Sequence, residues 1–197
     1  MGDAFMNAAI TVTEMRIPGC LQLHFPAYAD RRGSFVKVYR RSDFAESALE
    51  VEFAESFHTV SGERVLRGMH LQLPPAHHSK LVYCVAGRVL DVVLDLRRGS
   101  PAFGSHAAIE LSPEGNSGLY LPHGVAHGFY VLQAPSIMAY HVTSEHAAAL
   151  DAGVRWNSFG APWPDNDPVM STRDAALPPL CDFDSPFEFR PLAEAPG

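Results

Sequence analysis

Cysteines are scarce in this 197-residue sequence, which contains three. Cys20, Cys84 and Cys181 are widely spaced and form no CxxC pair, so the sequence indicates neither a disulfide framework nor a thiolate zinc site. Long apolar runs are missing as well, since no segment approaches the roughly 18 apolar residues of a membrane span and the N-terminus does not resemble a secretory leader. We therefore expect a cytoplasmic protein without a membrane partner.

An excess of basic residues is also missing, because 15 Lys and Arg face 22 Asp and Glu and give a formal net charge of −7. This balance argues against a nucleic-acid partner, although it is compatible with a local basic pocket for a phosphorylated small molecule. The chain has no internal repeat and contains 15 Gly and 16 Pro. These features predict one turn-rich domain over residues 1–197, with a core at about 15–180 and a C-terminal extension at 181–197.

Short runs of β-branched and aromatic residues alternate with Gly, Pro and Asp clusters along the chain. This pattern predicts a mainly β fold, an antiparallel sandwich or barrel with a few short helices. From Ala161 to Gly197 the chain lacks periodicity, so we expect it to wrap the barrel as irregular chain. The expected strands are Ser34–Tyr39, Lys80–Val85, Arg88–Leu96, Gly118–Leu121, His127–Leu132 and Ser136–Val142, and the expected helices, which open on capping residues, are Asp43–Ala48 and Ser171–Ala176.

Two segments indicate a double-stranded β-helix, the cupin jelly roll that holds a ligand at its open mouth. The stronger one is Pro122-His-Gly-Val-Ala-His127, which fits PxGxxH, a tight turn that delivers a histidine to the barrel interior. The other has the spacing of the metal-binding cupin motif. It reads His70-Leu-Gln72 where that motif has His-x-His, and it has Lys80 where that motif has Glu.

Lys80 argues against a metal site, because a protonated ammonium donates hydrogen bonds and cannot ligate a metal ion. We therefore expect no metal and no cofactor. The same stretch and the PxGxxH turn bring together His70, Gln72, Lys80 and His127, with Arg67 nearby. This set favours an anionic ligand and proton transfer, because imidazole titrates near neutrality and a cation stabilises a developing oxyanion.

Several other polar residues have plain structural explanations. His77 and His78 follow two prolines in an expected loop, where adjacent side chains are more often solvated than functional, and we set them aside. Taken alone, Tyr140 would be a packed amphipathic aromatic on a strand. Asp174 would be a charge at a helix N-terminus, which the helix dipole favours.

A longer series of motifs resembles the dTDP-4-dehydrorhamnose 3,5-epimerase family of nucleotide-sugar biosynthesis. The resemblance covers roughly residues 25 to 180, in the family's order. The stretches that carry it are Asp30-Arg-Arg-Gly33, Val65-Leu-Arg-Gly-Met-His70, Lys80-Leu-Val82, Leu90 to Arg97, Gly99 to Gly104, Ile109-Glu-Leu-Ser112, Leu121 to Phe129, Gly153-Val-Arg-Trp-Asn157 and Ser171-Thr-Arg-Asp174.

The resemblance implies a metal-free cupin, usually a homodimer, that inverts C3 and/or C5 beside the ketone of a nucleotide-linked 4-keto-6-deoxy sugar. It assigns His70 as the general base and Asp174 as the carboxylate that orients it. Tyr140 would be the acid on the opposite sugar face, and Lys80 would steady the enolate oxygen. Inversion needs both a base and an acid because the proton leaves one face of the carbon and returns to the other.

The resemblance also implies the residues that bind the substrate. Arg32, Arg67 and Arg173 would contact phosphates, because the planar guanidinium binds phosphate oxygens bidentately. The resemblance also places His127 and Asp151 at the substrate site, and Gln72 is added as a substrate-binding residue from the altered cupin motif.

Three positions depart from the family's common pattern. Lys37 stands where members commonly have Glu, and Glu55 and Phe57 stand where they commonly have a Gln-x-Asn segment. Those positions help read the nucleotide and its surroundings in the family, so these exchanges should alter recognition. We therefore hypothesise a divergent member that acts on another nucleotide 4-keto sugar or inverts only one carbon.

Other functions remain open from the sequence. A 3,4-ketoisomerase on the same scaffold would use a histidine pair on one face, and deuterium incorporation at C3 and C5 separates it from an epimerase. A metal-dependent cupin enzyme would use imidazoles, and bound iron, zinc or manganese would support it. A non-catalytic sugar-binding cupin is the last alternative. The imidazoles available to a metal are His70, His77, His78 and His127.

Overall fold

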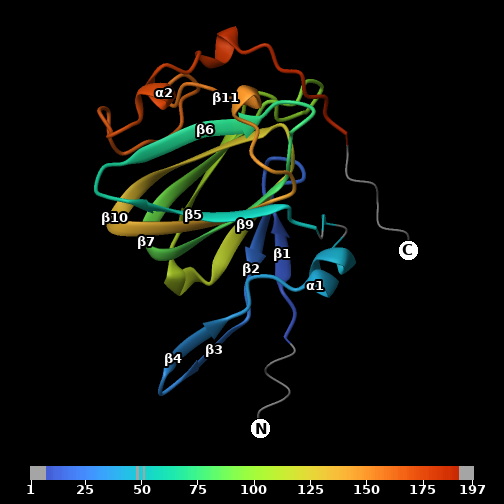
Figure 1. Cartoon of the computed structure of the whole chain (residues 1–197), viewed down its shortest axis with the longest axis vertical. Coiled ribbons are helices and arrows are strands. Elements are labelled where there is room, and N and C mark those ends of the chain that lie inside the picture. The colour runs from blue at the N-terminus through green and yellow to red at the C-terminus, as the bar shows by residue number, and fades with distance from the viewer. Residues whose placement is uncertain (1–7, 48, 51, 191–197) are drawn as a thin grey trace.

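Two long antiparallel strands, β7 (Lys80–Asp95) and β10 (Val125–Val142), run through the centre of the fold (Figure 1). The computed structural model describes residues 8–47, 49–50 and 52–190. The pairing of the two strands shifts register around Gly87, whose φ is +72°. A Cβ at this position would lie 2.4 Å from the carbonyl oxygen of Gln133, so this corner requires glycine. The sequence predicted each long strand as two shorter ones because the corner interrupts the apolar pattern.

The corner folds one continuous antiparallel sheet into two halves that face each other. The first half has the order β1-β2-β9-β7-β10-β5, and the second half has the order β8-β7-β10-β6-β11. This arrangement confirms the predicted mainly β fold of cupin jelly-roll type. The other strands of the sheet are β1 (Thr11–Glu14), β2 (Leu21–His24), β5 (Glu55–Ser61), β6 (Leu66–Gln72), β8 (His106–Leu111), β9 (Ser117–Leu121) and β11 (Asp151–Gly153).

A separate hairpin of two short strands projects from the sheet near the N-terminal end of the described chain (Figure 1). It consists of β3 (Ala27–Asp30) and β4 (Gly33–Val36). The strand predicted over Ser34–Tyr39 therefore begins one residue earlier and ends three residues sooner than expected.

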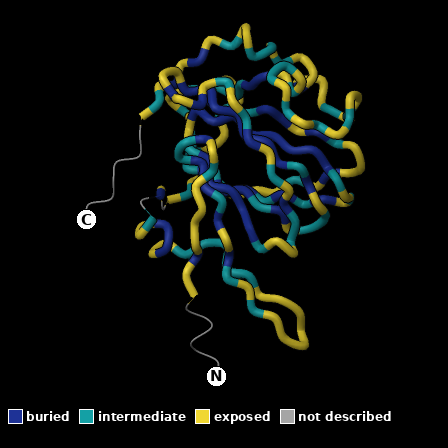
Figure 2. Tube along the Cα trace, turned by 180° about the vertical axis from the view of Figure 1, so that it is seen from behind, coloured by how far each residue is buried: buried dark blue, intermediate teal, exposed yellow. Residues whose placement is uncertain are grey.

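Apolar side chains cover both faces of the second half-sheet. One cluster lies between the two halves, and the C-terminal chain covers the outer face, where Phe159, Trp163 and Phe187 pack in one cluster with Val92 and Leu94. Figure 2 shows buried strands inside a rim of exposed loops. The predicted wrapping by irregular chain is thus confirmed as far as residue 190, whereas residues 191–197 of the predicted extension lie outside the described residues. The division into one domain over 1–197 stays a prediction.

The predicted C-terminal helix is present as α2 (Thr172–Ala175). Ser171 caps it as expected, because its Oγ accepts a hydrogen bond of 3.0 Å from the backbone N–H of Asp174. No helix in the described part of the chain is long and apolar enough to cross a membrane. The 3-10 turns are η2 (Pro113–Gly115), η3 (Ala148–Leu150) and η4 (Leu180–Asp182).

The first predicted helix is displaced toward the N-terminus. It is observed as α1 (Arg41–Glu46), two residues before the expected start at Asp43, and Ala48 at the expected end lies outside the described residues. Asp43 does not cap it. The buried carboxylate instead accepts a hydrogen bond of 2.7 Å from Arg40 Nε, which holds it inside the first turn.

Gly153 provides a test of close packing between β11 and β6. It pairs with His70, and a Cβ at Gly153 would lie 1.9 Å from the carbonyl oxygen of Met69. We expect Gly153→Ala to lower the free energy of unfolding by about 1–3 kcal/mol, because the backbone must shift to admit the methyl group. Urea denaturation measures this change. Gly62→Ala is the matched control, since a Cβ at Gly62 meets no atom within 4 Å, and equal stability of the two variants would contradict the prediction.

Candidate active site

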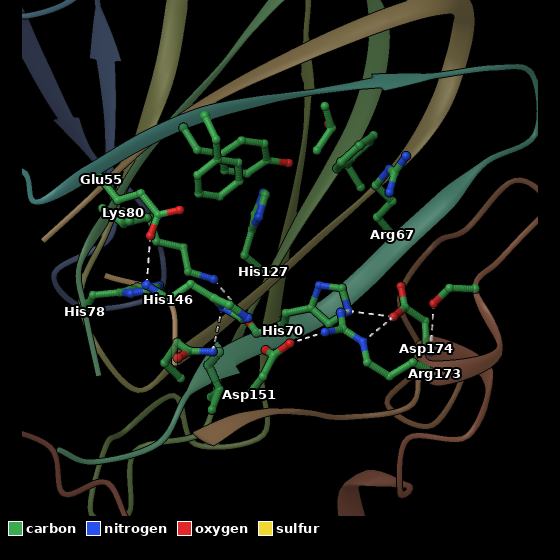
Figure 3. A pocket seen from close by; sticks show the side chains of 18 residues that line it. Glu55, Arg67, His70, His78, Lys80, His127, His146, Asp151, Arg173 and Asp174 are labelled. Atoms are coloured by element: carbon green, nitrogen blue, oxygen red, sulfur yellow. Dashed lines mark hydrogen bonds and ion pairs between the residues drawn. The ribbon is translucent and has the colours of Figure 1, made fainter. Parts of the chain in front are cut away.

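A cavity of about 600 Å³ lies between the two halves of the sheet. It brings together every site residue predicted from the sequence except Arg32 (Figure 3). The first half-sheet contributes Lys80 and Tyr140, and the second contributes His70 and His127. The remaining predicted residues that line the cavity are Arg67, Gln72, Asp151, Arg173 and Asp174.

His70 and Asp174 form a hydrogen-bonded pair, with 2.9 Å between Nε2 of the imidazole and Oδ1 of the carboxylate. The His70 side chain is 24% exposed, whereas that of Asp174 is 4% exposed. Burial alone would raise the pKa of Asp174, but the contact with His70 and the donors from Ser171 and Gly68 hold that pKa well below its usual range. Asp174 is therefore a fixed carboxylate beneath the imidazole.

Arg173 connects this pair to a second carboxylate. Its guanidinium forms an ion pair with Asp151, lies 3.2 Å from Asp174 Oδ1 and brings Nη2 within 2.8 Å of His70 Nε2. A ring nitrogen carries either a hydrogen or a lone pair, so Nε2 cannot donate to Asp174 and accept from Arg173 at once. Donation to the buried carboxylate leaves Nδ1 of His70 with the free lone pair, on the ring edge turned away from Asp174 (Figure 3).

Lys80 supplies a cation beside the backbone of His70. Its Nζ donates a hydrogen bond of 3.1 Å to the backbone carbonyl of His70. Burial lowers the pKa of Lys80 to about 8, against the opposing effect of the carboxylates of Asp151 and Asp91. The ammonium is thus charged at neutral pH and close to losing its charge in mild alkali.

Tyr140 occupies the opposite wall, on the first half-sheet. It is 7% exposed, and burial raises its pKa above the usual range, so the phenol keeps its proton. The ring of His127 meets it edge-on, with centroids 5.9 Å apart. His127 is itself fixed by a 2.7 Å contact between Nε2 and Oδ2 of the buried Asp91. The cavity therefore has a proton acceptor on one wall and a proton donor on the other.

Two histidines that were not selected from the sequence also line the cavity. His78, set aside as solvated, is half-buried with its Nδ1 3.1 Å from Ser144 Oγ, and that part of the prediction is wrong. Burial and the Lys80 charge lower the pKa of His78 to about 3, so it is neutral. His77 is exposed beside His123, as expected. His146 lies in the loop after β10, and no local signal marked either histidine because the pocket joins distant segments.

Gln72 and Glu55 hold the loop that carries His146. Gln72 Oε1 accepts a hydrogen bond of 2.9 Å from the backbone N–H of Ala147, and Glu55 Oε2 accepts one of 2.8 Å from the backbone N–H of His146. Both side chains also face the cavity. The departure at Glu55 therefore shapes the pocket by anchoring its rim.

Arg32 and Lys37 lie outside the cavity of this chain. Arg32 is on the β3–β4 hairpin, its side chain is 90% exposed, and it forms an ion pair with Asp30 at 2.6 Å. Its phosphate contact stays a prediction.

The imidazoles of the metal-dependent alternative do not converge. His127 is engaged by Asp91, and His77 is exposed and does not line the cavity. Within the described residues, no group of three or more His, Cys, Asp and Glu side chains is placed to hold a metal ion. Lys80 Nζ beside His70 also suits an anion better than a cation. A function without metal stays a prediction.

Comparison with known proteins identifies the family. The sequence profile of the family described as dTDP-4-dehydrorhamnose 3,5-epimerase matches residues 14–182. The chain belongs to the dTDP-4-dehydrorhamnose 3,5-epimerase family. The dTDP-4-dehydrorhamnose 3,5-epimerase of Sinorhizobium fredii is 35% identical over 166 residues, which cover 82% of this chain and 85% of that protein.

Solved structures of this epimerase family share the fold. A dTDP-6-deoxy-D-glucose-3,5-epimerase from Legionella pneumophila, in complex with dTDP-4-keto-L-rhamnose, matches with a TM-score of 0.87 and 29% identity, over 92% of this chain and all of that one (100%). A 3'-monoepimerase from Streptomyces bikiniensis, in complex with dTDP-quinovose, matches with a TM-score of 0.81 and 30% identity, over 85% of this chain and 86% of that one. Family membership makes the chain an isomerase of the epimerase type and removes the non-catalytic alternative.

Proposed function

We propose that the cavity binds a nucleotide-linked 4-keto-6-deoxy sugar and that the enzyme inverts C3 and/or C5. One observation carries this proposal: an oriented imidazole, His70 on Asp174, and a protonated phenol, Tyr140, line one cavity from opposite half-sheets. Epimerisation requires this placement, because a proton removed from one face of the sugar must return to the other.

In the proposed reaction, His70 Nδ1 removes a proton from a carbon beside the ketone. The C–H electron pair forms the carbon–carbon double bond of the enolate, and the carbonyl π electrons move to the oxygen. The ammonium of Lys80 stabilises that oxygen, a contribution worth about 10²–10³ in rate. Tyr140 then delivers its proton to the opposite face and the ketone re-forms. Solvent takes the abstracted proton from His70 and returns one to the Tyr140 phenolate, which resets the site.

Phosphate recognition is assigned to the arginines of the site. Arg67 is exposed at the cavity, with its Nε held 3.0 Å from Ser61 Oγ, and Arg173 is exposed with its Nη2 2.8 Å from His70 Nε2. Arg32 is distant from its own cavity on a projecting hairpin, so its predicted phosphate contact would need the cavity of a second copy. We propose a homodimer on this basis, and a cytoplasmic location on the basis of the unpaired thiols.

The function is tested by incubation in D₂O with a panel of dTDP-, CDP- and GDP-linked 4-keto-6-deoxy sugars, followed by NMR. Deuterium at C3 or C5 with inversion of the labelled carbon supports the proposal and names the preferred nucleotide. Migration of the ketone from C4 to C3 would identify a 3,4-ketoisomerase instead. No exchange with any sugar would overturn the proposal, and ordinary turnover of dTDP-4-keto-6-deoxyglucose at both carbons would refute the divergence suggested by Lys37, Glu55 and Phe57.

Lys80 predicts an alkaline limit to activity. Its pKa of about 8 means that the ammonium is present below this pH and lost as pH rises through it. We therefore expect kcat/KM to fall as pH increases through about 8, because the enolate oxygen loses its cation. Lys80→Arg should move this limit upward, since guanidinium keeps its charge, whereas Lys80→Met should be slower by about 10²–10³. A wild-type profile that stays flat well above pH 8 would contradict the assignment.

A further inference from the structure

Phe57, one of the departures from the family pattern, lies against the proposed acid. It is on β5, directly across from Tyr140 on β10 in the strand register. The two rings are stacked, with centroids 4.8 Å apart and an angle of 11° between their planes. Phe57 remains 43% exposed and lines the cavity, whereas Tyr140 is 7% exposed. Phe57 is thus a wall of the site that covers one face of the phenol.

Two aromatic side chains contact the ring of Tyr140. Phe57 contacts the face of the Tyr140 ring, and His127 contacts it edge-on from a position that Asp91 fixes. His127 and Asp91 are buried, but Phe57 is on a strand whose described pairing is with β10 alone. Of the two rings that contact the Tyr140 ring, Phe57 is therefore the exposed one.

We propose that Phe57 is a positioning residue that fixes the angle of the Tyr140 phenol and thereby controls reprotonation. This inference rests on the proposed function. Phe57 carries no group that can accept or donate a proton, so it acts through Tyr140 and not on the sugar carbon. Abstraction by His70 takes place from the other half-sheet and does not depend on this stack.

The fate of the enolate separates proton abstraction by His70 from reprotonation by Tyr140. The enolate carbon can regain a proton from His70, which restores the starting sugar, or receive one from Tyr140, which yields the epimer. In D₂O the first outcome labels recovered substrate once the imidazolium of His70 has exchanged its proton with solvent, and the second labels inverted product. The ratio of inverted product to labelled substrate therefore reports how well Tyr140 is placed, whereas the sum reports abstraction followed by exchange or inversion.

The test compares Phe57→Leu and Phe57→Asn with the wild type in D₂O, with the sugar that the panel selects. An aromatic pair of this kind changes an equilibrium by about 2- to 10-fold, so we expect the ratio to fall by that factor while total exchange and KM stay near wild type. Phe57→Tyr keeps the stack and should preserve the ratio. Val60→Ala is the control, because Val60 lies on the same strand, is 57% exposed and alternates to the other face.

The possible results separate the role of Phe57 from the epimerase function on which that role rests. A proportional loss of exchange and inversion in both Phe57 variants, or an unchanged ratio, would overturn the role of Phe57 and leave the epimerase intact. A wild-type protein that exchanges nothing would overturn the proposed function and this inference together. A lower ratio in both variants with a wild-type ratio in Phe57→Tyr would support the assignment.

Discussion

Replacing His70 by asparagine is expected to abolish most deuterium exchange and most inversion together, with a fall of about 10²–10⁴ in kcat. Asparagine keeps a polar side chain near Asp174 but has no basic lone pair. The other described imidazoles of the cavity are poorly suited to replace it. His127 is engaged by Asp91, the pKa of His78 is lowered to about 3 so that it is a weak base, and His146 lies 3.4 Å from the amide of Gln72. Single-turnover NMR in D₂O measures both processes on the same sample.

His77→Asn is the matched control for this loss. It makes the same substitution on an exposed imidazole of a neighbouring loop that does not line the cavity. We expect wild-type exchange and inversion from it. If His70→Asn retained exchange at a rate near that of the wild type, the base would have to be another group, and the role of Asp174 as its orienting carboxylate would be lost with it.

The elements predicted best are those whose signal is local. β9 and the two halves of β10 are largely apolar runs that include aromatic residues, and Ser171 is a capping residue at the start of a helix. β1 and β3 were not predicted, because their side chains are largely exposed and carry little apolar pattern. β5 was missed for the same reason, since its side chains remain mostly exposed beside the cavity.

The site residues could be predicted from the sequence more completely than the strands around them. Lys80 in place of a ligand carboxylate and the turn before His127 are local patterns, and the family resemblance added Tyr140 and Asp174 from distant segments. What no pattern indicated is the set of contacts that forms across the fold. The stack of Phe57 on Tyr140 and the engagement of His127 by Asp91 join strands that are far apart in the chain.

A second variant, Tyr140→Phe, should separate reprotonation by Tyr140 from abstraction by His70. Loss of the hydroxyl removes the proposed donor but keeps the ring that stacks on Phe57 and meets His127. We expect inversion to fall by about 10²–10⁴, while exchange into recovered substrate continues because His70, Asp174 and Lys80 remain. NMR in D₂O then finds labelled starting sugar with little epimer, a product pattern that His70→Asn does not give.

Tyr83→Phe controls for the loss of a phenol on the same sheet, because Tyr83 contacts His141 and does not line the cavity. It should leave both exchange and inversion at wild-type levels. Inversion that survives in Tyr140→Phe would mean that a water molecule or another side chain delivers the second proton. Loss of exchange together with inversion would place Tyr140 in the abstraction step, and the division of labour between the two walls of the cavity would then be wrong.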